Sequence, residues 1–495
     1  MTTTAPPIHS RPDHGWRRYT VPVVLAVVTL LIVIRLGWWM TASPSDTVDY
    51  VAQLKQLSMG AQPTSGENGM DALAAASRIE QLIRSEVIAE CTDRVSNLNS
   101  RDCYLVYDQM FHEPLELKDE LPGLQVIERF RDAGGFDHLD RAAAADMFLR
   151  DFTLEDSHGG SPLMQVRFFG DVDDRDLLRL ALASMRVAAM RGQHAEVCRY
   201  LQYALIVRHA RAIHPILIDQ LVATAMTSNI ATELRHLLQE HSFDEQTLVD
   251  MQRLLSGAYA EPDIAHGVQG EELFAKDFAQ WVFRDNGHGE GYLEPGLIRT
   301  VTNWGGDDDL PMSSFGGVLL ENRTQTMERI EAYYGLVAEY AALSPSERAI
   351  SPDTPQAFIA SLPQRQVLLR EITPMWPRFI DNHDETRADM RAAELMVAIE
   401  RFRAVHGRLP VSQAELVPSC LDEPLVDPIT ERPFVYTLTS FGVSGYLISR
   451  SGLDRVDDLA VLLPNAVSLE QLDVELRAMT DDTVMNPQRT LWIDQ

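Results

Sequence analysis

The sequence predicts a mainly α-helical protein with one N-terminal transmembrane helix, an α-hairpin body and a small α+β module with a β-hairpin near the C-terminus. Three observations lead to this fold class: an apolar run close to the N-terminus, a series of amphipathic patterns separated by glycine or proline, and two short β-type runs late in the chain. With 495 residues and 45% hydrophobic content, the chain is long enough for two or three domains.

The N-terminal apolar run predicts a transmembrane helix at residues 19–40, after a short tail at residues 1–18. A spanning helix needs roughly 20 mostly apolar residues, and this segment reaches that length when the Arg35 side chain extends to the membrane surface. A cleaved signal peptide is the alternative, because the uninterrupted apolar run is short. In both cases the rest of the chain leaves the cytoplasm.

The charges that flank this run predict its orientation. Arg17 and Arg18 precede it, whereas Asp46 and Asp49 follow it. The positive-inside rule therefore places the N-terminus in the cytoplasm and the body outside. We expect a single-pass protein of the inner (cytoplasmic) membrane, with the membrane as a partner of the N-terminal helix.

A linker at residues 41–70, rich in turn-forming residues, leads to the predicted helical body at residues 71–380. The clearest helical block spans Asp174 to Ser256 and contains helices at about 174–191, 193–212 and 216–240. A fourth helix is predicted to start at a capping box formed by Ser242 and Glu245. A long helix is expected at about 319–343. Consecutive antiparallel helices of this kind predict helical hairpins.

The C-terminal module is predicted at residues 381–465, followed by a tail at 466–495. An amphipathic helix is expected from Asp384 to Val405, and Gly407 is placed to end it. A second capping box is expected at Ser412–Glu415, before a one-turn helix. Two strands, at about 434–438 and 445–449, complete the module.

Four stretches of this module carry a family resemblance. In one-letter code they are "AIERFRAVHGRLP", "ELVPSCL", "DPITERPFVY" and "YLISRSGLD". Together, over about residues 385–460, they resemble the globular domain of type II secretion major pseudopilins, and a module that closes large bacterial membrane proteins with helical middles. The resemblance implies a helix ended by glycine, an Asp-Pro turn, a hairpin and an acidic loop.

The chain also departs from the pseudopilin pattern. It lacks the processing signal of a pilin precursor, and some 340 residues separate the N-terminal run from the module. Glu431 stands where the family has glycine. We therefore expect the module to be reused as a domain of a larger protein rather than to form a pilus subunit.

The resemblance implies a possible calcium site in the acidic loop. Pseudopilins bind calcium there, and the matching positions in this chain are Asp454, Asp457 and Asp458. Calcium takes six to eight oxygen ligands, which three carboxylates and nearby carbonyls can supply. A solvated loop with ordinary charges is the alternative, because "LAVLLP" replaces the glycine-rich continuation of the family loop.

The charge balance restricts the class of partner. The formal net charge of −29 repels the phosphates of nucleic acids, so DNA or RNA binding is not expected. The four cysteines are too few for a disulfide scaffold in a domain of this size, although Cys91 and Cys103 are close enough in sequence to close a short loop.

No short catalytic motif is found in the sequence. His383-Asp384-Glu385 is interpreted as the acidic start of a helix, and His209, His214 and His236 have no partner at a recognisable spacing. Two classes of function remain: a non-catalytic scaffold or interaction protein of the cell envelope, such as one related to secretion, or an envelope hydrolase with a site between the helical body and the C-terminal module.

Overall fold

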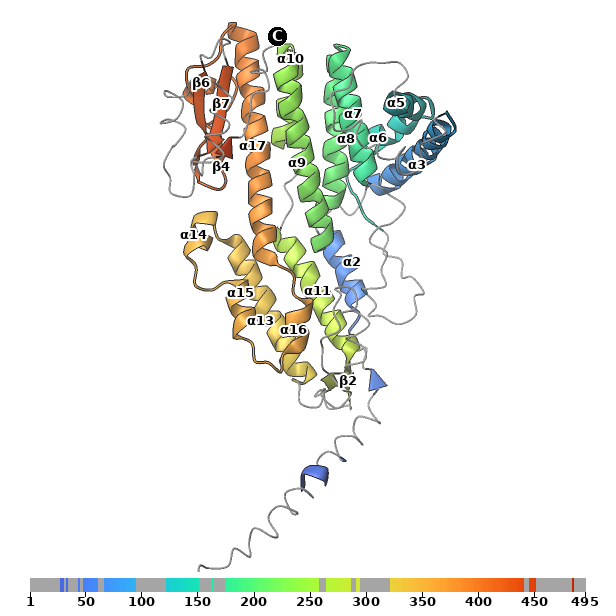
Figure 1. Cartoon of the computed structure of the whole chain (residues 1–495), viewed down its shortest axis with the longest axis vertical. Helices are drawn as coiled ribbons and strands as arrows, with labels where there is room; N and C mark the ends of the chain where they lie inside the picture. The colour runs from blue at the N-terminus through green and yellow to red at the C-terminus, as the bar shows by residue number, and fades with distance from the viewer. Residues whose placement is uncertain are drawn as a thin grey trace, which may run out of the picture.

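The computed structural model of the chain describes residues 27–30, 33, 43–44, 48–60, 66–94, 122–150, 163, 174–257, 264–285, 291–293, 321–439, 445–450 and 483–484. Helices dominate this part of the chain and lie in an elongated arrangement (Figure 1). The prediction of a mainly α-helical protein is therefore confirmed.

The upper half of the molecule in Figure 1 contains the helices of the first core and the upper part of the longest helix. In chain order these helices are α3 (Gly69–Arg94), α5 (Pro122–Asp132), α6 (Gly135–Ala143), α7 (Asp174–Met190), α8 (His194–Ala212), α9 (Leu217–Glu240), α10 (Glu245–Gly257) and α17 (Trp376–His406). Helices α7, α8 and α9 are successive antiparallel neighbours, as the hairpin pattern predicts. Gly192 adopts φ +66° between α7 and α8, a backbone conformation that glycine adopts without strain.

The lower half contains the remaining helices. They are α2 (Tyr50–Gly60), α11 (Ile264–Val282), α13 (Arg323–Ala342), α14 (Pro345–Ile350), α15 (Pro355–Ser361) and α16 (Val367–Ile372). Three short antiparallel strands lie at the base of this half: β1 (Ser43–Pro44), β2 (Phe283–Asp285) and β3 (Tyr292–Leu293).

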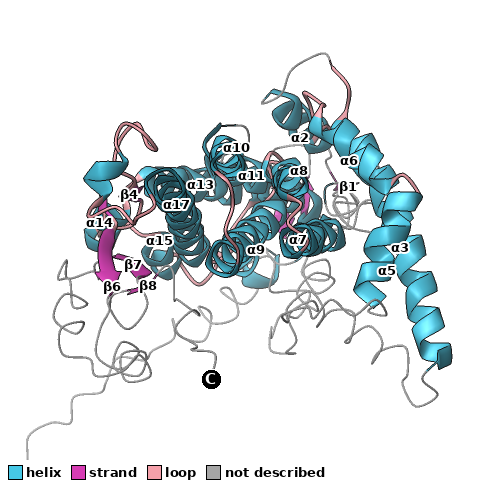
Figure 2. Cartoon of the chain, turned by 90° about the horizontal axis from the view of Figure 1, so that it is seen from above, coloured by secondary structure: helices cyan, strands magenta, loops and turns pink. Residues whose placement is uncertain are grey.

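The C-terminal strands lie beside the upper part of α17 (Figures 1 and 2). The hairpin of β6 (Val435–Thr439) and β7 (Gly445–Arg450) pairs Val435 with Ser449 and confirms the two predicted strands. The other strands are β4 (Val426–Asp427), β5 (Arg432–Pro433) and β8 (Thr483–Val484), and η3 (Gln413–Leu416) is a one-turn 3-10 helix. Gly407 ends α17 with φ +69°, as predicted.

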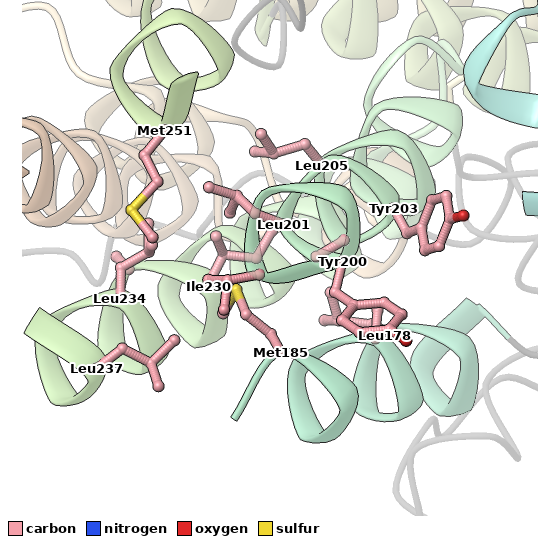
Figure 3. Packing of buried hydrophobic residues seen from close by; sticks show 14 of the residues in the cluster. Leu178, Met185, Tyr200, Leu201, Tyr203, Leu205, Ile230, Leu234, Leu237 and Met251 are labelled. Carbon is pink, nitrogen blue, oxygen red and sulfur yellow. The ribbon is translucent and has the colours of Figure 1, made fainter. Parts of the chain in front are cut away.

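Buried apolar side chains form an upper core and a lower core. The upper core includes Leu178, Tyr203 and Ile230, which interdigitate from neighbouring helices (Figure 3). The lower core includes Phe278, Tyr334 and Trp376. Helix α17 contributes to both, with residues 376–380 in the lower core and residues 388–402 in the upper one. The boundary predicted at residue 381 therefore falls within a continuous helix.

The expected N-terminal transmembrane helix requires a correction. No helix in the part of the chain that the structure describes has both the length and the apolar character needed to cross a membrane. Of residues 19–40, only 27–30 and 33 are described, and they are helical. The physical weakness of the prediction is Arg35, because the apolar run before it is shorter than the roughly 20 residues that a span requires.

Both predicted capping boxes are also wrong. Helix α10 starts three residues after Ser242, and its cap is Asp244, whose Oδ1 accepts a hydrogen bond of 2.9 Å from the Thr247 amide. Ser412 makes no side-chain cap at η3. A capping box is instead found at α14, where Ser344 and Glu347 satisfy each other's backbone amides.

Candidate functional site

The acidic residues predicted to bind calcium lie outside the described residues. This applies to Asp454, Asp457 and Asp458, so calcium binding stays a prediction. Within the described ranges, no group of three or more His, Cys, Asp or Glu side chains is arranged to hold a metal ion.

His383-Asp384-Glu385 does not start a helix, because α17 begins seven residues earlier, at Trp376. Asp384 is buried and accepts a hydrogen bond from the Arg348 guanidinium of α14, and burial raises the pKa of its carboxyl group. The side chain therefore joins α14 to α17. Its role is structural.

A closed ring of four buried charges lies where three helices of the body meet. Arg211, at the end of α8, contacts Asp174 at the start of α7 and Asp219 at the start of α9. Arg150 completes the ring, 3.8 Å from Asp174 and 3.4 Å from Asp219. Each of the four side chains is at most 7% exposed. We call this group the ionic ring.

The ionic ring has no net charge when all four groups are ionised, and each carboxylate faces two guanidinium groups. Burial nevertheless raises the pKa of Asp174 to about 6, against the opposing pull of Arg211 and Arg150. Removing one member of such a buried group leaves a charge without its partner, which typically costs about 3–5 kcal/mol. The ring therefore fixes the relative positions of α7, α8 and α9.

His214 lies beside the ionic ring and is fully buried. Neither of its ring nitrogens has a hydrogen-bond partner. Burial drives the pKa of His214 far below its ordinary value, and the positive charges of Arg150 and Arg211 add to this effect. The imidazole is therefore neutral. Its burial fits a side chain packed in the core better than a catalytic acid or base that exchanges protons with solvent.

The segment from His214 to the start of α9 is held by polar contacts from two helices. Gln220 donates hydrogen bonds to the carbonyl oxygens of Ala212 and His214, at 2.5 and 2.8 Å. From α11, Glu271 Oε1 accepts a hydrogen bond of 3.0 Å from the Leu217 amide, the first of α9. Burial raises the pKa of Glu271 to about 7.

The second candidate site is a small pocket in the lower half, between β2, β3, α13 and α16. Its apolar lining consists of Phe283, Leu293, Leu368 and Leu369. Its polar lining consists of Glu321, Thr326, Arg329, Arg365 and Gln366. We call it the amide pocket, after the Gln366 side chain. The enclosed room is only about 10 Å³, which is enough for roughly one water molecule.

Backbone contacts hold the polar residues of the amide pocket in place. The Arg323 amide donates to Gly291 O at 3.0 Å, which joins the start of α13 to the loop before β3. The Glu321 amide donates to Arg365 O at 3.5 Å, and the Gln366 amide donates to Pro363 O at 3.0 Å. Arg365 Nε also lies 3.3 Å from Glu321 Oε1.

Three polar atoms of the amide pocket are buried without a hydrogen-bond partner: Glu321 Oε2, Gln366 Oε1 and Gln366 Nε2. The two residues are only 5% and 4% exposed. A buried polar group without a partner costs about 1–3 kcal/mol. A set of three such atoms in one pocket therefore indicates a place where a small polar group, of the size of a water molecule, makes hydrogen bonds.

Comparisons of the chain with models of protein families, with curated proteins and with solved structures give no match.

The ionic ring had a signal in the sequence that the motif search missed. Asp174, Arg211 and Asp219 each stand at a predicted helix end, the acids at helix starts and the base at a helix end. Successive antiparallel helices bring these ends together. The amide pocket had no comparable signal, because its lining comes from four separate segments between residues 283 and 369.

Proposed function

We propose that the protein is a non-catalytic interaction protein whose helical body binds a protein partner. The observation that carries this proposal is the amide pocket, whose lining combines a buried carboxylate oxygen and a buried amide group without hydrogen-bond partners with four apolar side chains. Such a set makes hydrogen bonds and binds a polar group. The body supplies a rigid support, since α13 and α16 both pack in the lower core.

The pseudopilin likeness of the C-terminal module belongs to the same proposal. The order of elements from Trp376 onward supports this likeness. A helix ended by Gly407 is followed by a turn at Asp427 and then by the β6–β7 hairpin. Glu431 has φ +57°, the conformation that glycine adopts most easily, at the position where the pseudopilin pattern has glycine. The expected envelope location depends on the N-terminal segment and stays a prediction.

A hydrolase is the second candidate, because Asp174 and His214 both lie near Arg150 and Arg211 and both have shifted pKa values, a feature of many active sites. Burial argues against it. Asp174 and His214 are 2% and 0% exposed, and Asp174 is already paired with two arginines. A substrate would have to displace the ionic ring in order to reach either group.

Crosslinking in intact cells tests the proposal. The full chain is crosslinked reversibly, purified and compared with the Asp174→Asn variant. An interaction protein yields one partner in near-stoichiometric amount with both forms, provided that the variant is folded. Recovery of no partner, together with turnover of envelope substrates that Asp174→Asn abolishes, would establish the hydrolase instead.

A further inference from the structure

One face of α9 is exposed to solvent and carries no charged side chain between Leu217 and Leu234. The two charged residues of this stretch are buried instead: Asp219 lies in the ionic ring, and Glu233 pairs with Arg186 of α7. The exposed positions of the stretch are Ile218, Leu221, Ala225, Asn229 and Thr232. We call these five residues the neutral stripe.

The composition of the neutral stripe is that of a contact surface. The solvent-facing positions of a surface helix are usually charged or polar. Helix α13 follows this rule, since Glu328, Arg329 and Glu331 are exposed on it. In the neutral stripe Ile218 and Leu221 are 38% and 37% exposed on a chain with a net charge of −29. Depletion of charged residues is typical of the centre of a protein interface.

The spacing of the neutral stripe fits a second copy of the same helix. Ile218, Ala225 and Thr232 are each seven residues apart, and Leu221 follows Ile218 by three, as in a coiled-coil heptad. A β-branched residue at the first position and leucine at the fourth favour two parallel helices. In such a pair each residue of the stripe lies opposite its own copy, so isoleucine meets isoleucine and leucine meets leucine.

The helices on the two sides of α9 would also meet in a parallel pair. Helix α9 lies between α17 and α7 when the molecule is seen from above (Figure 2). Both α9 and α17 begin in the lower core, with Leu217 and Trp376, and continue into the upper core, so they run in the same direction. Helix α7 runs parallel to α9 because α8 lies antiparallel to both. A two-fold axis along α9 therefore brings α7 of one copy against α17 of the other.

The exposed charges of α7 and α17 are complementary. On α7, Arg179 and Arg186 lie seven residues apart and share a face, which adjoins α9 because Arg186 contacts Glu233. On α17, Asp389 lies 3.3 Å from Arg235 of α9. Two further acids, Asp381 and Glu385, share the face of Asp389 at steps of four residues and are exposed.

The two sets of charges also lie at the same height along α9. Arg179 is about 10 Å below Arg186, and Asp381 is about 12 Å below Asp389, at 1.5 Å per residue. The upper members of both sets contact α9 at positions only two residues apart. A parallel pair therefore places basic side chains of one copy opposite acidic side chains of the other. Below this level Arg175 and Arg378 are both basic and exposed, so the contact ends there.

We propose that two copies of the chain associate in parallel through the neutral stripe of α9, with α7 of each copy facing α17 of the other. Such an interface is isologous, because each copy contributes the same surface. The stripe is about 21 Å long, and a standard interface buries about 800 Å² per partner. We therefore expect a weak dimer that dissociates in the micromolar range. It does not depend on the protein partner proposed above.

Sedimentation analysis of the full chain over a range of micromolar concentrations tests the proposal. We expect a monomer–dimer equilibrium. Leu221→Glu should weaken the dimer about 10-fold or more, because two like charges then face each other. Leu82→Glu on α3, where the leucine is 66% exposed, is the matched control and should leave the equilibrium unchanged. A monomer at every concentration, or a dimer that tolerates Leu221→Glu, would overturn the proposal.

Exchange of charges between the flanking helices tests the facing of α7 and α17. Arg179→Glu and Glu385→Arg should each weaken the dimer, because each brings like charges together. The two substitutions combined should restore it. Glu328→Arg on α13 is the control for a reversed surface charge. Chemical unfolding shows that each variant is folded. Additive weakening in the folded double variant would contradict the proposed facing.

Disulfide trapping tests the parallel direction. In a parallel pair, Leu221→Cys places one thiol against its own copy and should give a covalent dimer on mild oxidation, which the parent chain does not give. In an antiparallel pair, Leu221 would lie opposite Asn229 instead. A dimer trapped only when Leu221→Cys and Asn229→Cys are combined would show the antiparallel arrangement and overturn the parallel one.

Discussion

Glu271 shows how the protonation of a single half-buried side chain bears on the stability of the fold. Its carboxylate accepts a hydrogen bond from the first amide of α9. Burial raises its pKa from an ordinary value of 4.5 to about 7. The side chain therefore combines a capping role with a titration near neutral pH.

The sign of the pH effect follows from the raised pKa. Between about pH 4.5 and 7 the native state holds a proton that the unfolded chain has released, so the contribution to stability is complete below that window and is lost as the pH rises through it. We predict that Glu271→Gln, which keeps an acceptor but does not titrate, flattens this dependence. At pH 8 it should be more stable than the parent by about 1–3 kcal/mol.

Urea unfolding at pH 5 and at pH 8 measures this difference. Glu272→Gln is the matched control, because the adjacent carboxylate forms an ion pair with Lys276 at 2.8 Å instead of capping α9. The prediction would be wrong if both variants changed with pH in the same way.

At the scale of elements, α11 approaches closely the backbone of the turn that precedes α9. A Cβ atom at Gly270 would clash with the carbonyl oxygen of Pro215, which belongs to the backbone and cannot move aside by itself. Gly335, on α13, has no atom within 4 Å of the same position. Glycine is therefore required by packing at position 270 but not at position 335.

Alanine at these positions should have opposite effects. We predict that Gly270→Ala lowers the free energy of unfolding by about 3 kcal/mol or more, because α11 must move away from α9. Gly335→Ala should raise it by about 0.5–1 kcal/mol, because alanine favours the helix. Thermal or urea unfolding measures both values. Destabilisation by the two substitutions to the same extent would contradict the packing described for Gly270.

Elements and their ends were predictable to different degrees. The limits of α8 and α9 follow closely from the apolar period and from Gly192 and Pro215, since both residues interrupt helices. The N-terminal cap of α10 could not be predicted from the sequence, because Ser242, Asp244 and Thr247 all have side chains that can cap a helix. Which of them accepts the hydrogen bond depends on where packing of Phe243 places the chain.

At the scale of the whole molecule, α17 joins the two cores. Its 31 residues span roughly 46 Å at 1.5 Å per residue, and its ends are buried in different cores. The sequence pattern revealed the amphipathic C-terminal part of this helix but not its earlier start at Trp376. The reason is the proline at its second position, Pro377, which fits the first turn of a helix as well as a loop.

The candidate sites also differ in how much of each can be predicted from the sequence. The ionic ring follows from charges at helix ends once the hairpins are known. The amide pocket requires the folded chain, since Phe283 and Gln366 are far apart in sequence and only tertiary packing brings them to one pocket. The prediction of a calcium-binding loop at Asp454 rests on resemblance alone.

Site-specific photo-crosslinking tests the central claim, that the helical body binds a partner at the amide pocket. A photo-reactive residue replaces Gln325, which is exposed on α13 one turn before Arg329 of the pocket lining, or Arg253, which is 71% exposed on α10 in the upper half. We predict a discrete crosslinked product in cells from position 325 and not from position 253, and its loss when Gln366→Leu is added. The same product from both positions, or its persistence in the Gln366→Leu background, would contradict the claim.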